Sequence, residues 1–196
     1  MDIKSLKGIA VVSIEQGEKV GVVDNALFDL EKRNVIAFKL IKPGFRRAGG
    51  IVITMDDVES IGKDAVMIRD KEMIRELKHE RELQDRPDIG AFTALRVVSQ
   101  DGTYVGNVAT VQIDTKSGRI TELEITGGSI IDRIRRNKVI PAQDIISIGS
   151  DVVIVPDQHA PKGEPEKDKN EDEELKQITE KAQEQEKKGD DDRIVN

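Results

Sequence analysis

Side chains with the chemistry needed for catalysis or metal binding are few in this sequence. Each of the two histidines, His79 and His159, lies in a charged stretch without the partner spacing of a catalytic pair or a metal site. The chain has no cysteine, which excludes disulfides, thiolate ligands and a cysteine nucleophile. We therefore expect both histidines to be solvated, with His159 in a disordered tail.

Two adjacent carboxylates, Asp56 and Asp57, form the best candidate for a metal or hydrolytic site. They stand at the boundary between a predicted strand and a turn. Aspartates at such boundaries usually accept hydrogen bonds from nearby backbone N–H groups, which is the interpretation that we favour. A small-molecule or hydrolytic site at this turn is the third-ranked hypothesis for the function.

Phosphate-binding patterns are not found either. Gly62-Lys63 lacks the upstream glycine of a P-loop, and Gly49-Gly50 lacks the following Lys and Ser/Thr. We expect no catalytic residue, no metal and no cofactor, and a protein that is not an enzyme.

Basic segments occur at equivalent places in the two halves of the chain. They supply the candidate interaction residues Phe45, Arg46, Arg47, Ile130, Ile131, Arg133, Ile134, Arg135 and Arg136. Ser129 has the side chain to cap a helical turn that would gather the three isoleucines beside the arginines. Either the isoleucines plug the end of a domain, or they form an exposed apolar spot rimmed by arginine, as at protein-binding sites.

Composition divides the chain into a body and a tail. Residues 156–196 hold 14 acidic and eight basic side chains with almost no large apolar residue, so we predict a charged, mostly disordered tail. This tail contributes most of the net charge of −7, and the overall acidity disfavours nonspecific binding of nucleic acid. No secretory signal or membrane-spanning segment is recognised, which predicts a cytoplasmic protein that meets membranes only through a partner.

An internal repeat organises the body. Val20–Asp29 (VGVVDNALFD) matches Val105–Asp114 (VGNVATVQID) at a shift of 85 positions. Farther on, Asp56–Ile68 matches Gln143–Val155 at a shift of 87, so the second copy has gained two residues in between. The repeat predicts two similar units at residues 1–70 and 89–155.

Alternating β-branched residues separated by Gly, Asp and Asn indicate about six short strands in each unit. Closing so small a sheet into a barrel removes its exposed edges, so the expected fold class is all-β, with two tandem small antiparallel barrels. Four residues are expected to have structural roles, two as turn-fixing aspartates and two as glycines where backbones approach closely: Asp29, Asp114, Gly21 and Gly106.

The two units are joined by residues 71–88, which are rich in helix-forming residues and end near Pro87. Met73, Ile74, Leu77 and Leu83 form one narrow apolar stripe in this stretch. We predict a short, charged helical connector that rests its stripe on one barrel.

The order of these motifs resembles the PRC-barrel family, which includes the reaction-centre H subunit and the ribosome-maturation factor RimM. The resemblance rests on SLKGIAVVSIEQGEKVGVVDNALFD in the first copy and VVSQDGTYVGNVATVQID in the second, each with the later Asp-(Val/Ile)-x-x-Ile-Gly-x-Asp element. The chain shows neither the membrane helix of the former protein nor the extra N-terminal domain of the latter, which disfavours both of their specific roles.

Known members of this family act mostly as adaptors that contact larger assemblies. The resemblance therefore implies a non-enzymatic adaptor or scaffold that binds a protein or a protein complex through barrel loops. Self-association is a further option. The alternative is RNA- or ribosome-associated binding through the basic loops, for which affinity should fall steeply with salt.

Overall fold

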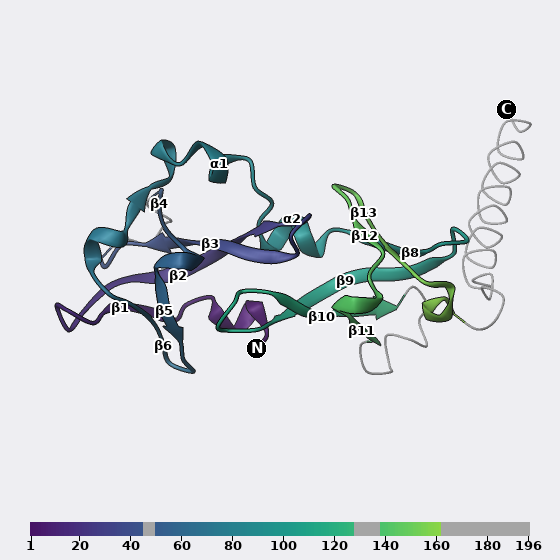
Figure 1. Cartoon of the computed structure of the whole chain (residues 1–196), viewed down its shortest axis with the longest axis horizontal. Coiled ribbons are helices and arrows are strands. Elements are labelled where there is room, and N and C mark those ends of the chain that lie inside the picture. The colour runs from purple at the N-terminus through teal and green to yellow at the C-terminus, as the bar shows by residue number, and fades with distance from the viewer. Residues whose placement is uncertain (45–49, 128–137, 162–196) are drawn as a thin grey trace, which may run out of the picture. The chain divides into compact units, whose positions relative to one another are not determined.

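The computed structural model describes residues 1–44, 50–127 and 138–161 (Figure 1). Met1–Ala160 form one compact unit that contains two separate sheets. The first sheet has the strand order β5-β6-β1-β2-β3-β4-β7 and the second the order β11-β10-β9-β8-β13-β12. The prediction of two tandem β-barrels is confirmed.

Each barrel contains the six strands that the repeat predicts. In the first they are β1 (Ala10–Ser13), β2 (Glu18–Asp29), β3 (Asn34–Ile41), β4 (Ile51–Thr54), β5 (Val58–Ile61) and β6 (Ala65–Ile68). In the second they are β8 (Arg96–Ser99), β9 (Tyr104–Ile113), β10 (Ile120–Gly127), β11 (Lys138–Pro141), β12 (Ser147–Ile148) and β13 (Val152–Val155).

The sequence led us to expect wholly antiparallel sheets, but each sheet contains one parallel pair of strands. In each barrel the last long strand runs parallel to the first, β6 beside β1 and β13 beside β8. The other strand pairs are antiparallel. The chain follows the curled sheet through the intervening strands, so that the returning strand pairs with the edge of the first strand that the second strand does not occupy.

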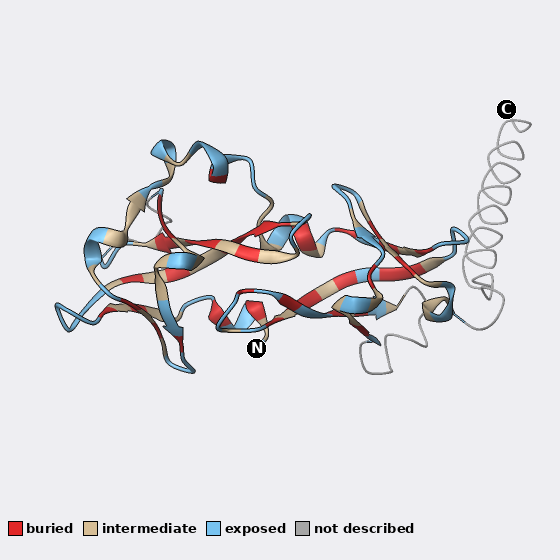
Figure 2. Cartoon of the chain, viewed as in Figure 1, coloured by how far each residue is buried: buried red, intermediate tan, exposed pale blue. Residues whose placement is uncertain are grey.

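Alternation along the strands decides which side chains fill the barrels. Val35, Phe38 and Leu40 of β3 are buried, and so are their repeat equivalents Ile120, Leu123 and Ile125 of β10 (Figure 2). Successive side chains of a strand point to opposite faces, which explains the two-residue steps from Phe38 to Leu40 and from Leu123 to Ile125. The three-residue steps from Val35 and from Ile120 span irregularities in the pairing with β2 and β9.

The connector differs from the single helix that we predicted. It consists of the 3₁₀ turn η3 (Lys71–Met73), the strand β7 (Arg75–Glu76), the 3₁₀ turn η4 (Leu77–His79) and the one-turn helix α1 (Arg81–Gln84). Strand β7 pairs with the edge of β4, whose backbone N–H and C=O groups would have no partner there if the connector were a helix. The apolar stripe does rest on the first barrel: Leu77 and Leu83 pack on Leu27, Ala37 and Val52.

The turns between the long strands meet each other across the two barrels. Asn34 forms a β-bridge with Arg119, its own equivalent in the repeat. The Val35 N–H donates to Gly118 O at 2.9 Å, and the Ile120 N–H donates to Arg33 O at 3.0 Å. Val35 and Ile120 are equivalent in the repeat, and so are Arg33 and Gly118. The two hydrogen bonds are therefore the same bond with the two barrels exchanged, as at the interface of a two-fold symmetric dimer.

The segments that precede the two barrels are exchanged in the same reciprocal way. The 3₁₀ turn η1 (Ile3–Leu6) begins barrel one but packs on β9 of barrel two. Helix α2 (Ile89–Thr93) begins barrel two and contacts both its own β9 and β2 of barrel one. The Ile113 N–H donates to Met1 O at 2.8 Å, and the Phe28 N–H donates to Pro87 O at 2.9 Å.

Aspartates at the start of both exchanged segments fix them in place. Asp2 caps η1 and accepts a hydrogen bond from Thr110 Oγ1 at 2.6 Å. Asp88 caps α2 and accepts one from Asn25 Nδ2 at 3.0 Å. As a result one apolar cluster runs through both barrels, joined where the rings of Phe28 and Phe92 lie 4.9 Å apart between centroids.

This shared core predicts that the two barrels unfold together. Phe28→Ala removes a fully buried ring from barrel one and should lower the free energy of unfolding by about 3–5 kcal/mol. Tyr104, the only tyrosine in a chain without tryptophan, lies in barrel two and reports on that barrel by fluorescence. In Phe28→Ala, the midpoint temperature measured by Tyr104 fluorescence should fall by as much as the midpoint temperature measured by circular dichroism.

The exposed Ile14 supplies the control, since Ile14→Ala should move neither transition. A Tyr104 transition that stays in place in Phe28→Ala, while the circular dichroism shows an earlier one, would contradict joint unfolding.

Candidate interaction surfaces

The two basic segments predicted to bind a partner lie outside the described residues. This applies to Phe45, Arg46, Arg47, Ile130, Ile131, Arg133, Ile134, Arg135 and Arg136. Their role stays a prediction. The structure describes the strands on either side of each segment, β3 and β4 in the first barrel and β10 and β11 in the second.

The two glycines of the repeat lie where strands approach closely. A Cβ atom on Gly106, which has φ +152°, would stand 2.2 Å from Thr126 O and 2.7 Å from the Ile125 side chain. A Cβ atom on Gly21 would stand 3.3 Å from Ile41 O. Only glycine fits at Gly106 without moving the neighbouring strand, so this position serves the barrel wall.

Asp29 and Asp114 lie at equivalent ends of β2 and β9 and hold the turns that follow. Asp29 accepts a hydrogen bond from the Lys32 N–H at 3.0 Å and forms an ion pair with Arg86 at 3.3 Å. Asp114 Oδ1 accepts hydrogen bonds from the Ser117 hydroxyl at 2.7 Å and the Ser117 N–H at 2.8 Å. These hydrogen bonds lower the pKa of Asp114 below its ordinary 3.8, and the bond from the Ser117 hydroxyl has the largest effect.

The candidate carboxylate site at Asp57 is used for local structure. Its carboxylate accepts hydrogen bonds from the Thr54 hydroxyl at 2.5 Å and, more weakly, from the Thr54 N–H at 3.3 Å. Arg75 of β7 donates to both of its oxygens, at 3.0 and 3.1 Å. Asp57 therefore fastens the connector to the first barrel. Within the described parts of the chain, no cluster of three or more acidic or histidine side chains could hold a metal ion.

Its repeat equivalent, Asp144, contacts a side chain from the segment that follows the second barrel. His159 Nε2 lies 3.0 Å from Asp144 Oδ2, and only 12% of the His159 side chain is exposed. The prediction that His159 lies solvated in a disordered tail is therefore wrong, because the 3₁₀ turn η6 (Asp157–His159) returns it to the barrel. The repeat did not signal this contact, because His159 does not occupy the position that corresponds to Arg75, the partner of Asp57.

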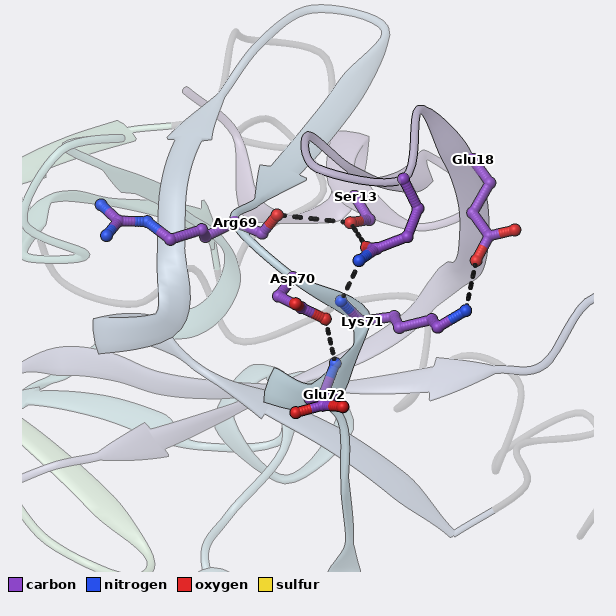
Figure 3. A network of polar contacts seen from close by, with 7 residues as sticks. Ser13, Glu18, Arg69, Asp70, Lys71 and Glu72 are labelled. Atoms are coloured by element: carbon purple, nitrogen blue, oxygen red, sulfur yellow. Dashed lines mark hydrogen bonds and ion pairs between the residues drawn. The ribbon is translucent and has the colours of Figure 1, made fainter.

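Polar networks hold the chain as it leaves each barrel. In the first, the buried Ser13 hydroxyl donates to the Gln16 side chain and to Arg69 O, the latter at 3.3 Å (Figure 3). The same Gln16 oxygen accepts from the Lys71 N–H at 3.3 Å, and Lys71 forms an ion pair with Glu18 at 3.2 Å (Figure 3). The hairpin between β1 and β2 thus fixes the start of the connector.

The second barrel repeats this arrangement with other side chains. The Ser99 hydroxyl donates to Asp101 Oδ1 at 2.5 Å and to Thr103 O at 3.1 Å. The Asp101 N–H in turn donates to Asp157 Oδ1 of η6 at 3.0 Å. The residues just after Val155 are therefore part of the folded barrel.

One open hollow, with a volume of about 520 Å³, lies against the connector. Its lining residues are Gly50, Glu76, Leu77, Lys78 and Gln84. Glu76 forms an ion pair with Lys78 at 2.6 Å, and the hydrogen bond from Lys78 lowers the pKa of Glu76. Gln84 Nε2 donates to Lys78 O at 2.9 Å. The polar side chains of this hollow are thus engaged in holding the connector.

Comparison with known families agrees with this architecture. The PRC-barrel domain matches the chain twice, over residues 1–74 and 91–160. The chain belongs to the PRC-barrel domain family. The second match ends at Ala160, where the compact unit of the structure also ends. No curated protein matches the sequence. No described helix is long and apolar enough to cross a membrane.

The Asp114 turn gives a pH-dependent prediction. Because hydrogen bonding lowers the pKa of Asp114 in the folded state, its contribution to stability is present above about pH 4 and is lost as the pH falls through the lowered pKa. Asp114→Asn should therefore lower the melting temperature at pH 7, and the difference from the wild type should shrink as the pH is lowered toward 2.

Glu122→Gln is the matched control, because Glu122 is exposed on β10 and its substitution should change the melting temperature at neither pH. A difference for Asp114→Asn that stays constant between pH 7 and pH 2 would contradict a charge-dependent role of the turn.

The C-terminal boundary gives a prediction from two truncations. Ending the chain after Pro161 removes only residues that are poor in apolar side chains, so the melting temperature should stay unchanged. Ending it after Val155 also removes the His159–Asp144 and Asp101–Asp157 contacts and should lower stability by about 1–3 kcal/mol.

Thermal unfolding of the two truncated chains and the full chain measures this difference. Equal stability of all three would show that η6 contributes nothing, and loss of stability on cutting after Pro161 would contradict the independence of the tail.

Proposed function

We propose that this PRC-barrel protein is a non-enzymatic adaptor that binds a protein partner through the outer surfaces and loops of its barrels. The observation that carries the proposal is the use made of its potentially reactive side chains. Asp57 and His159, which were considered as candidates for chemistry, fasten the chain segments that follow each barrel, Asp57 through Arg75 and His159 through Asp144. These side chains therefore position the backbone of the protein itself.

The architecture supports the same proposal. The reciprocal contact between the barrels occupies the turns of β2–β3 and β9–β10 and the exchanged segments η1 and α2. The surfaces left for a partner are the parts of the outer sheet faces and edges that the connector does not cover, and the loops at their other ends. Binding through preformed β-surfaces suits an adaptor, since a rigid scaffold holds them without further ordering.

A pull-down with the full chain, followed by quantitative mass spectrometry, tests the proposal. We expect one protein or complex to be enriched reproducibly over a control bait. The control is the Phe28→Ala variant at a temperature between its transition and that of the wild type, where only the wild type is folded. This control separates binding by folded barrels from adsorption to exposed apolar surface. Failure to enrich any partner in repeated experiments would defeat the proposal.

The same preparation discriminates the two other hypotheses. Binding to structured RNA at low salt, lost steeply as salt rises, would favour RNA recognition by the basic segments. Turnover or tight binding of a small molecule that is abolished by Asp57→Asn would favour a site at the aspartate turn.

A further inference from the structure

The two barrels differ most clearly at the outer edge of their fourth strands. At the shift of 87, β4 of the first barrel corresponds to β11 of the second. Strand β4 lies between β3 and β7, whereas β11 is the terminal strand of its sheet within the described residues. In the first barrel this edge is thus paired with β7, a strand of the connector.

The connector shows what this edge accepts. Strand β7 runs antiparallel to β4, with Arg75 opposite Val52 and Glu76 opposite Ile51. The Leu77 N–H donates to Gly50 O at 2.7 Å, and bonded pairs alternate along antiparallel strands, so the backbone groups of Val52 face β7. Leu77 and Leu83 then cover the Val52 side chain, which is fully buried.

The equivalent of Val52 is Val139, whose exposed fraction is 47%. By the same alternation, the backbone N–H and C=O of Val139 face away from β10. Lys138 and Pro141 flank it on β11, residues that protect an edge from indiscriminate pairing. This edge therefore presents one apolar side chain and one pair of outward backbone groups between two guarding residues.

The face beside Val139 has changed its chemistry as well. Leu27 and Ala37, which pack under the connector in the first barrel, are replaced by Gln112 and Glu122 in the second. Gln112 already donates to Glu124 at 2.9 Å, and Glu122 is exposed. A segment that crosses this face would meet an acidic side chain where the connector meets apolar ones.

Within the described residues, the stretch that follows the second barrel does not form a second β7. The turns η3 and η6 correspond at a shift of 86, which places Pro161 at the position of Arg75. Proline has no N–H to donate, so it cannot copy the hydrogen bonding of Arg75 to an edge strand.

We propose that the edge of β11 is a strand-addition site for an extended segment of a partner protein. The segment would pair with the backbone of Val139, place an apolar side chain over the Val139 side chain and direct a basic side chain to Glu122. This inference rests on the proposed adaptor function and specifies the surface used. Main-chain hydrogen bonds provide affinity in this mode of recognition, and side chains on alternate positions provide selectivity.

A peptide titration of the full, ¹⁵N-labelled chain tests the site. The probe is a synthetic peptide that copies residues 70–84 of the connector, with Leu83 replaced by lysine to match Glu122. Backbone resonances of β11 and β10 should shift on binding, most strongly at Val139 and Glu122. The unmodified connector peptide should bind more weakly, because it brings Leu83 to an acidic position.

Variants at one residue separate edge pairing from general adhesion. Val139→Pro removes the outward N–H, and Val139→Lys keeps it but adds a charge; each should weaken binding roughly tenfold or more. Ile146→Thr is the matched control, because Ile146 is similarly exposed, at 44%, but lies outside β11. Unchanged amide spectra away from the substitution confirm that each variant is folded.

Each outcome decides the inference. Shifts confined to β10 and β11 that both Val139 variants abolish support it. Absence of binding by either peptide at millimolar concentration, or equal binding by the Val139 variants, overturns it. A sedimentation experiment in which Val139→Pro dissociates an oligomer of the free chain overturns it in favour of a second copy as the occupant.

The partner recovered by pull-down distinguishes this inference from the function on which it rests. If the Val139 variants retain that partner at wild-type level, the edge is not the binding surface but the adaptor function stands. If no partner is enriched by the wild type, the adaptor function itself fails.

Discussion

The reciprocal docking of two aspartate-capped segments is the constraint on which the rest of the structure depends. Asp2 and Asp88 each begin a short helical segment that packs on the long strand of the other barrel, and the segment after Asp88 also contacts the long strand of its own. The apolar residues of these segments, among them Leu6 and Phe92, complete the core of the pair. Neither barrel therefore encloses its core with its own residues alone, and burial in one half stabilises the other.

Symmetry at this contact is close but not complete, and the departures are informative. Arg33 and Gly118 are equivalent, and both have left-handed backbone, with φ of +54° and +70°. The Arg33 guanidinium reaches Ala142 O at 3.1 Å and Ile146 O at 3.0 Å. A Cβ atom at Gly118 would stand only 2.9 Å from Val35 O, so no side chain fits there. One half of the contact is held by a long cation and the other by close backbone packing.

Sequence patterns predicted the parts of this molecule that depend on local residue type. Alternation and the repeated Gly and Asp positions gave the strands and the turns, because turn chemistry and strand periodicity are local properties. The helical connector was predicted wrongly, since the helix propensity of its residues is outweighed by the backbone partners that β4 offers to Arg75 and Glu76. The exchange of η1 and α2 is a tertiary contact without a periodic signature.

The candidate site was less predictable for a similar reason. His159 looked like a lone residue in a charged tail, and only the position of Asp144 in the fold gives it a partner. Val139 and Val52 are equivalent in sequence, yet one is exposed and the other buried, because the difference is made by the connector, which lies far from Val139 in the sequence. Exposure of an apolar residue is set by what covers it, which residue type alone does not specify.

Fusion of two barrels in one chain explains how such a difference can persist. Two identical copies that met by the same reciprocal contact would carry the same edge strands, so a segment that covered one edge would cover both. Within a single chain, the stretch that follows the first barrel has become β7, whereas the stretch that follows the second has Pro161 at the corresponding position. The linkage also makes the contact between the barrels intramolecular, which removes its dependence on concentration. The covered edge then stabilises the first barrel, whereas β11 is the terminal strand of its sheet within the described residues.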